Sequence, residues 1–131
     1  MDAFDIARLR SGHDFSSGEP YLEFIREASL SVGLYVLSAG ATDNQRPHDE
    51  DEVYHVVDGR ARIRVGEEDR AVGPGTVVFV GAGVEHRFHS IEEDLTVLVF
   101  FAPAESTSAP RTRRPAEKKR GDEGVISKER W

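Results

Sequence analysis

Three residues in the middle of the sequence belong to the types that bind divalent metal ions. His48 stands four positions before Glu52, at the start of an alternating apolar segment, and His86 opens a second such segment. Two imidazoles and one carboxylate that converge inside a barrel would hold a metal and leave several coordination positions open. The chain has no cysteine, so any metal would be held by nitrogen and oxygen donors. These residues predict a 2-His-1-carboxylate site if the fold brings them together.

Short strands separated by turns are predicted from residue 4 to residue 101. The strand-like segments are, in chain order, YLEFIREA, SLSVGLYVLSAG, EVYHVV, RARIRV, TVVFV, EHRFHS and LTVLVFFA. Asp58-Gly59 lies between the third and the fourth, and this dipeptide predicts a hairpin turn. Only AFDIARLR, near the N-terminus, favours a helical turn or two. Many short strands with turn signals predict an all-β sandwich or barrel.

The alternation of side chains along EVYHVV predicts which residues share a face. Because residues two positions apart point the same way on a strand, Glu52 and Tyr54 are expected on one face. Val53, His55 and Val57 are then expected on the other. Two valines outside a barrel require cover, which predicts a homodimer interface or a covering layer of N-terminal strands. The segment LTVLVFFA is apolar on both faces and supports the same homodimer prediction.

The spacing around His48 and Glu52 resembles the first sequence motif of the cupin superfamily. Five residues separate Gly40 from Arg46, one separates Arg46 from His48, three separate His48 from Glu52, and six separate Glu52 from Gly59. In that family the motif normally supplies two histidines and a glutamate. By position His48 matches the second histidine and Glu52 the glutamate, whereas Arg46 replaces the first histidine.

A second group of residues resembles the second cupin motif, which supplies one histidine. It consists of Gly75, Gly81, Gly83, His86 and Ser90, with Gly81 where proline is usual and Ser90 where asparagine is usual. The resemblance covers roughly residues 30–102. It implies a small double-stranded β-helix, a barrel of the jelly-roll kind, with the metal near its centre. The expected organisation is a single cupin barrel with N-terminal strands over residues 1–103, followed by a tail.

The composition of the ligand set stays open at this point. An arginine is always charged and has no lone pair to donate, so Arg46 cannot be a ligand. A metal could be held by His48, Glu52 and His86 alone. A fourth oxygen ligand could come from Gln45 or, less readily, from Asp43 or Glu50. The third alternative is a site without metal.

Two further residues are candidates for catalysis. Arg46 could grip a substrate carboxylate or phosphate at the pocket mouth. The alternative, which the nearness of the acids at positions 49–51 favours, is that Arg46 pairs with them and is turned outward by Pro47. Tyr54 could be part of the barrel core, or its hydroxyl could act as a donor or acid beside the metal, since pockets place few polar groups among many apolar ones.

Charge is distributed unevenly along the 131 residues. The net charge is −7, yet residues 1–104 hold nine Lys/Arg against nineteen Asp/Glu. Such an acidic domain repels phosphates, so nucleic acid is not an expected partner. Residues 104–131 are rich in Ser, Pro, Lys and Arg and are predicted to form a disordered, charged tail.

These features predict a metal-dependent enzyme that acts on a small organic molecule. The cofactor would be one divalent ion of Fe, Mn, Zn or Ni. An iron site would suit dioxygenase-like chemistry, and a zinc or manganese site would suit isomerase or lyase chemistry by a Lewis acid. The alternative is a non-catalytic cupin that binds a small ligand as a sensor, with a degenerate metal site. No signal peptide or apolar run of membrane-spanning length is visible, so a cytoplasmic location without a membrane partner is expected.

Overall fold

In the computed structural model, the structure describes residues 1–106, and most of the regular structure among them consists of strands. One short helix, α1, comes first, and six strands follow. Their bounds are α1 Ile6–Ser11, β1 Tyr21–Glu27, β2 Leu30–Leu37, β3 Asp51–Val65, β4 Glu68–Val72, β5 Val77–Val80 and β6 His86–Ala102. The predicted disorder of the tail from residue 107 onward lies outside the described residues.

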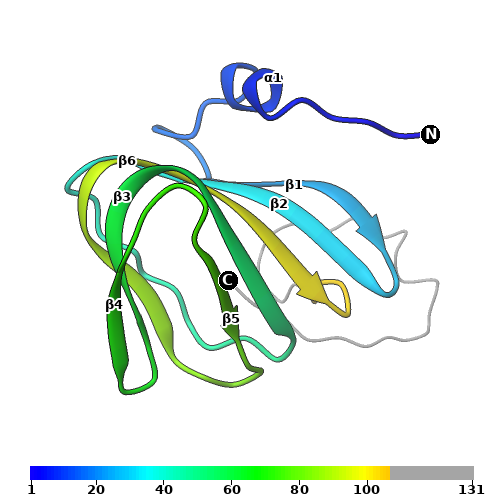
Figure 1. The fold of residues 1–131 in the computed structure, drawn as a ribbon. Coiled ribbons are helices and arrows are strands. Elements are labelled where there is room, and N and C mark those ends of the chain that lie inside the picture. The colour runs from blue at the N-terminus through cyan, green and yellow to red at the C-terminus, as the bar shows by residue number, and fades with distance from the viewer. Residues whose placement is uncertain (107–131) are drawn as a thin grey trace.

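The strands form one antiparallel sheet that curls into a barrel (Figure 1). The strand order is β1-β2-β6-β3-β4, and β5 also pairs with β3. The two longest strands, β3 and β6, pair with each other from Asp51 and Ala102 at one end to Val65 and His86 at the other. The prediction of an all-β fold is therefore confirmed. Helix α1 contacts β2, outside the barrel.

The predicted hairpin at Asp58-Gly59 is wrong. Strand β3 runs through this dipeptide without reversing, and its pairing with β6 shifts register there. Gly59 has a positive φ of 94°, and its α-carbon lies so close to β6 that an added Cβ would stand 2.2 Å from the Asp94 carbonyl oxygen. The true hairpin turn lies at Gly66-Glu67, between β3 and β4.

The irregularity at Gly59 explains why the two halves of β3 looked like separate strands. Before it, the inward side chains fall at even positions such as Tyr54 and Val56, and after it they fall at odd positions such as Ala61 and Ile63. A hairpin or a bulge can each produce this change of phase, and here it is a bulge that also bends the strand. Strand β6 changes phase in the same way between Phe88 and Leu95, so two predicted strands again form one.

The barrel interior is apolar except at one end. Side chains from all strands build the core, among them Tyr35, Tyr54, Val56, Ile63, Val80, Phe88, Leu95, Val97, Val99 and Phe101. Each of these is at most 5% exposed to solvent. Four buried acids interrupt this pattern: Asp43, Glu50, Glu52 and Glu105.

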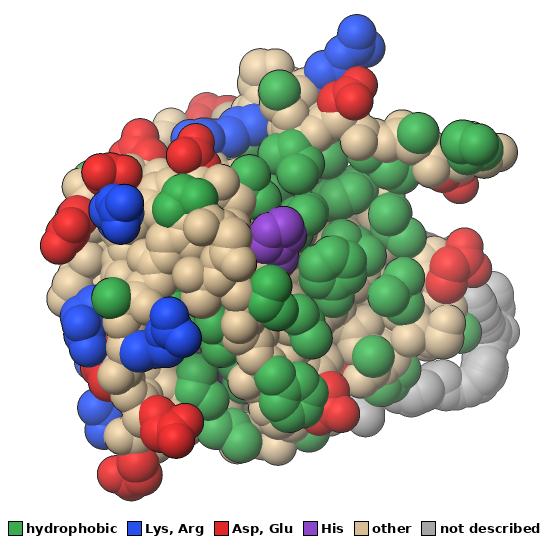
Figure 2. Space-filling model, viewed as in Figure 1, with side chains coloured by type: hydrophobic (Ala, Val, Ile, Leu, Met, Phe, Trp, Pro, Cys, Tyr) green, Lys and Arg blue, Asp and Glu red, His purple; other side chains and the backbone are tan. Residues whose placement is uncertain are grey.

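The outer surface of the sheet is also apolar over its central strands. Phe79 of β5 lies beside Val53 of β3, which lies beside Phe100 of β6, so three apolar side chains form one cross-strand row. Phe79 and Val77 are each 63% exposed. Figure 2 shows one face of the molecule on which hydrophobic side chains gather around a histidine, with charged side chains towards the rim.

The segment that follows β6 remains in contact with the sheet as far as residue 106. The backbone N–H of Glu105 donates to the Ser31 hydroxyl, and that of Ser106 donates to the Glu50 carboxylate. The boundary at residue 103 stays a prediction. Within residues 1–106, no helix has the length and the hydropathy needed to span a bilayer.

Candidate metal centre

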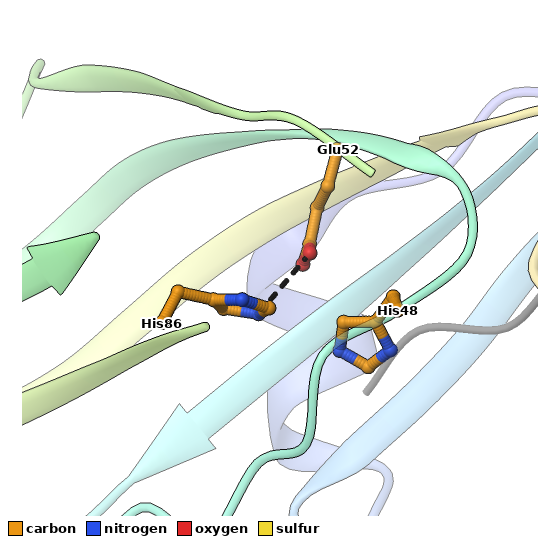
Figure 3. Close-up of side chains that lie close together, drawn as sticks. All are labelled: His48, Glu52 and His86. Atoms are coloured by element: carbon orange, nitrogen blue, oxygen red, sulfur yellow. Dashed lines mark ion pairs between the residues drawn. The ribbon is translucent and has the colours of Figure 1, made fainter. Parts of the chain in front are cut away.

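His48, Glu52 and His86 come together at one end of the barrel interior (Figure 3). One candidate ligand atom from each lies within 4.8 Å of the others, and all three side chains are buried. The His86 Nε2 atom is 3.3 Å from Glu52 Oε1, and the two imidazole ring centres are 5.0 Å apart. Ligands held at about 2.1 Å around one octahedral ion lie about 3 to 4.2 Å apart. The 3.3 Å between His86 and Glu52 falls in this range, and the 4.8 Å limit on the whole group is slightly wider.

Three separate elements supply these side chains. Glu52 lies on β3, between its neighbours Val80 of β5 and Phe101 of β6. His86 is the first residue of β6, directly after the turn that contains Gly83. His48 lies in the loop before β3, and its carbonyl oxygen accepts a hydrogen bond of 2.6 Å from the Gly83 N–H. This bond joins the loop of the first motif to the turn of the second.

The hydrogen bonds of His86 determine which ring nitrogen is available to a metal. Its Nδ1 atom lies 2.8 Å from the Val84 carbonyl oxygen, which can only accept, so Nδ1 carries the proton. In the neutral ring, Nε2 then presents a lone pair towards the interior. Such a contact from the second ring nitrogen is the usual way in which proteins fix the tautomer of a metal-binding histidine.

Gln45 directs an oxygen at the same point. Its side-chain carbonyl, Oε1, is 3.0 Å from His86 Nε2 and 3.5 Å from His48 Nε2. Its Nε2 donates instead to the Asp43 carboxylate, at 2.6 Å. Lone pairs from a neutral imidazole, a carboxylate and an amide therefore converge, and acceptors placed so close together need a cation or a proton between them. The residues present fit a divalent metal ion.

The family to which the chain belongs follows from a match to a family model described as the cupin domain, over residues 33–101. The protein is a member of the cupin family. The family predicted from the spacing of the two motifs is thereby confirmed. This cupin is also 55% identical over 106 residues to an uncharacterized protein of Streptomyces coelicolor, a match that covers 81% of this chain and all of the relative.

Solved structures resemble this cupin in fold. TT1209 from Thermus thermophilus matches with a TM-score of 0.67 and 27% identity, over 79% of this chain and 99% of that one. An RmlC-like cupin of Methanocaldococcus jannaschii, with a double-stranded β-helix, has a TM-score of 0.58 and 15% identity, over 69% and 87%. The DMSP lyase DddQ of Ruegeria pomeroyi has a TM-score of 0.55 and 24% identity, over 66% and 42%. The predicted double-stranded β-helix is confirmed.

Tyr54 lies beside the ligand group in this cupin. Its hydroxyl donates to Gln45 Oε1 at 3.1 Å, and its ring contacts Phe88, with ring centres 4.9 Å apart. Burial, reinforced by the negative charges of Glu52 and Asp43, holds the pKa of Tyr54 well above its usual value. The hydroxyl therefore keeps its proton at neutral pH and acts as a donor.

Arg46 is not part of the ligand group. The arginine is exposed, as is Pro47 after it, whereas the neighbouring Gln45 faces the interior. Among residues 1–106, no ion pair joins Arg46 to the acids at positions 49–51, so the expected pairing is not found. Asp51 instead accepts a hydrogen bond from the Ala82 N–H at 3.0 Å.

Asp43 and Glu50 were predicted from the sequence only as less favoured alternatives to Gln45 for a fourth ligand. Glu50 is 1% exposed, lies directly before β3 and accepts a hydrogen bond from the Ser106 N–H at 2.9 Å. Asp43 is 3% exposed and contacts Gln45 rather than the histidines. Burial raises the pKa of Asp43, although hydrogen bonds from Tyr35, Phe88 and Gln45 oppose the shift. Nothing in the residue pattern distinguished Asp43 from other loop acids.

Proposed function

We propose that this cupin is a metal-dependent enzyme acting on a small organic molecule. His48, Glu52 and His86 would hold one divalent transition metal ion, with Gln45 Oε1 as a fourth ligand. The observation that supports this best is the convergence of three kinds of acceptor on one buried point. An octahedral ion with these ligands would keep two positions for substrate or O₂.

The bound ion would supply either oxygenase chemistry, as Fe²⁺, or Lewis-acid chemistry of the isomerase or lyase type, as Zn²⁺, Mn²⁺ or Ni²⁺. The DMSP lyase of Ruegeria pomeroyi has the same fold. At 24% identity, this likeness supports lyase chemistry only as one of the possible reactions. Fold alone does not select a reaction.

The chain's own residues would orient and protect the substrate. Tyr54 would donate a hydrogen bond to a substrate oxygen, because its hydroxyl stays protonated and already points at the ligand group. The rings of Phe88 and Phe101 would exclude water from the point of reaction. Arg46 would act only outside the barrel, by attracting an anionic group towards the mouth.

The alternative proposal is a non-catalytic cupin that binds a small ligand or acts as a sensor. One observation favours it: His86 Nε2 lies within 3.3 Å of both Glu52 Oε1 and Gln45 Oε1. A second proton on His86, at Nε2, could therefore take the place of a metal ion between these acceptors. The chain has an arginine where the family's first histidine usually stands, so a degenerate site is consistent with the motif.

Metal analysis of the native protein separates the two proposals. The protein would be purified without a chelator and without a nickel column, and its metal content would be measured by mass spectrometry. We expect near-stoichiometric Fe, Mn, Zn or Ni, and we expect added Mn²⁺ or Zn²⁺ to refill metal-stripped protein. A protein that neither carries nor takes up an ion would support the ligand-binding alternative.

We further propose that two copies associate through the outer apolar face formed by Val53, Val77, Phe79, Leu98 and Phe100. A second copy is the occupant that fits, because the row of Phe79, Val53 and Phe100 is apolar and Val77 and Phe79 are each 63% exposed, and homodimer interfaces bury such apolar side chains. The cytoplasmic location expected from the sequence stays a prediction.

Light scattering coupled to size-exclusion chromatography should show a dimer at micromolar concentration. Phe79→Lys, which places a charge in the middle of the face, should yield a folded monomer. Glu92→Lys, at an exposed position in the bend of β6, is the control and should remain dimeric. A monomeric wild-type protein at tens of micromolar would refute the proposed interface.

A further inference from the structure

We infer that Asp43 is a positioning residue that orients the side-chain amide of Gln45 so that its oxygen, and not its nitrogen, faces the metal ligands. This inference rests on the proposed function, since it assigns to Gln45 the place of the histidine that the first motif lacks. Both residues lie among the five positions between Gly40 and Arg46 for which the motif specifies no residue type.

Three groups from different parts of the chain donate hydrogen bonds to the Asp43 carboxylate. Its Oδ2 atom accepts from the Phe88 backbone N–H at 2.8 Å and from Gln45 Nε2 at 2.6 Å. Its Oδ1 atom accepts a short hydrogen bond from the Tyr35 hydroxyl. The carboxylate is thus anchored to β6 by a backbone group and to β2 by a buried side chain. It is 3% exposed, so water cannot readily replace any of these partners.

The chemistry of the partners allows only one orientation of the Gln45 amide. A carboxylate can only accept, so the amide NH₂ group must face Asp43 and the carbonyl must face the other way. The Tyr54 hydroxyl reinforces this orientation by donating to Oε1 at 3.1 Å. If the amide were reversed, its oxygen would face the Asp43 carboxylate oxygen, and neither can donate. Its N–H groups, which cannot coordinate a cation, would then face the ligand group.

Removal of Asp43 should therefore weaken metal binding through Gln45. Titration calorimetry with Mn²⁺ and Zn²⁺ on metal-stripped protein should show a loss of about 10–100-fold for Asp43→Ala, as for other groups that orient metal ligands. Gln45→Ala should show a loss of similar size. The double variant should bind no more weakly than Gln45→Ala alone, because the two residues act in series.

A conservative substitution should restore what alanine removes. In Asp43→Asn, the amide oxygen can still accept from Phe88 and Gln45, while the new NH₂ group can donate to the Tyr35 oxygen. Asp43→Asn should therefore keep metal affinity within a few-fold of the wild type. Val72→Ala, a buried change in β4 outside the hydrogen bonds of Asp43 and Gln45, controls for loss of stability and should leave metal affinity unchanged within about twofold.

A second readout needs no metal. In ¹⁵N spectra of the metal-stripped protein, the Gln45 side-chain NH₂ resonance should be protected from solvent exchange and shifted by its bond to Asp43. The protection should vanish in Asp43→Ala and persist in Asp43→Asn. An unprotected Gln45 amide in the wild type would overturn the inference, as would additive losses in the double variant.

The two proposals fail in different ways. If the wild type binds no ion, the proposed function fails, and the amide spectrum alone decides the part assigned to Asp43. If the wild type binds tightly and loses its metal in His48→Ala, but not in Asp43→Ala or Gln45→Ala, the metal site stands and the inference is refuted.

Discussion

The variants His48→Ala and His86→Ala should each abolish tight metal binding, with metal affinity falling by at least ~100-fold. This loss is larger than the one expected on removing a residue that only orients a ligand. Each imidazole is one of only three strong ligands, and both are buried where no solvent group can replace them. Glu52→Gln should weaken binding strongly as well, because the carboxylate also supplies the negative charge that offsets the charge of the ion. Calorimetry with Mn²⁺ and Zn²⁺ on metal-stripped protein measures all three changes.

Two other histidines of the chain serve as matched controls. His55 lies on the outer face of β3, and His89 contacts the exposed Asp69 carboxylate at 2.8 Å, so neither belongs to the ligand group. His55→Ala and His89→Ala should keep the metal content of the wild type. Full metal content in His48→Ala would show that the ion binds elsewhere, and equal losses in all four histidine variants would point to a general effect on folding.

Gly59→Ala should destabilise the barrel by about 3 kcal/mol or more, the sum of backbone strain and steric overlap. An alanine would have to adopt a φ near 94°, and its Cβ would stand 2.2 Å from the Asp94 carbonyl oxygen and 2.8 Å from the Leu95 α-carbon. Both obstacles are backbone atoms of β6 and cannot move aside without breaking the β3–β6 pairing. Urea unfolding at one fixed protein concentration gives the change in free energy.

Gly75 offers a close control for this experiment. Its φ is 91°, almost the same as that of Gly59, but an added Cβ would meet no atom within 4 Å. Gly75→Ala should therefore carry the backbone strain alone, about 1–3 kcal/mol. The difference between the two variants isolates the close approach of β3 to β6. If both variants lost the same free energy of unfolding, β3 and β6 would be able to move apart at the bend without loss of stability.

The family and the fold could be predicted from the sequence because the motifs fix the spacing of glycines and ligands along the chain. The strand pattern supported the barrel independently, since Glu52 and Tyr54 were expected to share a face and do so. The hairpin at Asp58-Gly59 was wrong for a physical reason. A bulge and a turn impose the same change of phase and the same positive φ, and only pairing with a distant strand, β6, decides between them.

The immediate surroundings of the ligands could be predicted only in part. Gln45 was preferred over Asp43 and Glu50 as a fourth ligand, but the sequence did not indicate that Asp43 would lie beside the Gln45 amide. Asp43 is held in place by a hydrogen bond from the Phe88 N–H, 45 residues further along the chain. The position of this donor depends on how β6 lies in the barrel. Local patterns carry no information about such a partner.

The long pairing of β3 with β6 has a consequence for the order of events in folding. Glu52 and His86 lie at opposite ends of this ladder and meet only because both strands bend. The ligand group is therefore complete only after both strands have paired and bent, and contacts that form late do not lower the folding barrier. An ion bound there would act mainly by slowing the opening of the finished barrel, so that metal would determine how long each molecule stays folded rather than how fast it folds.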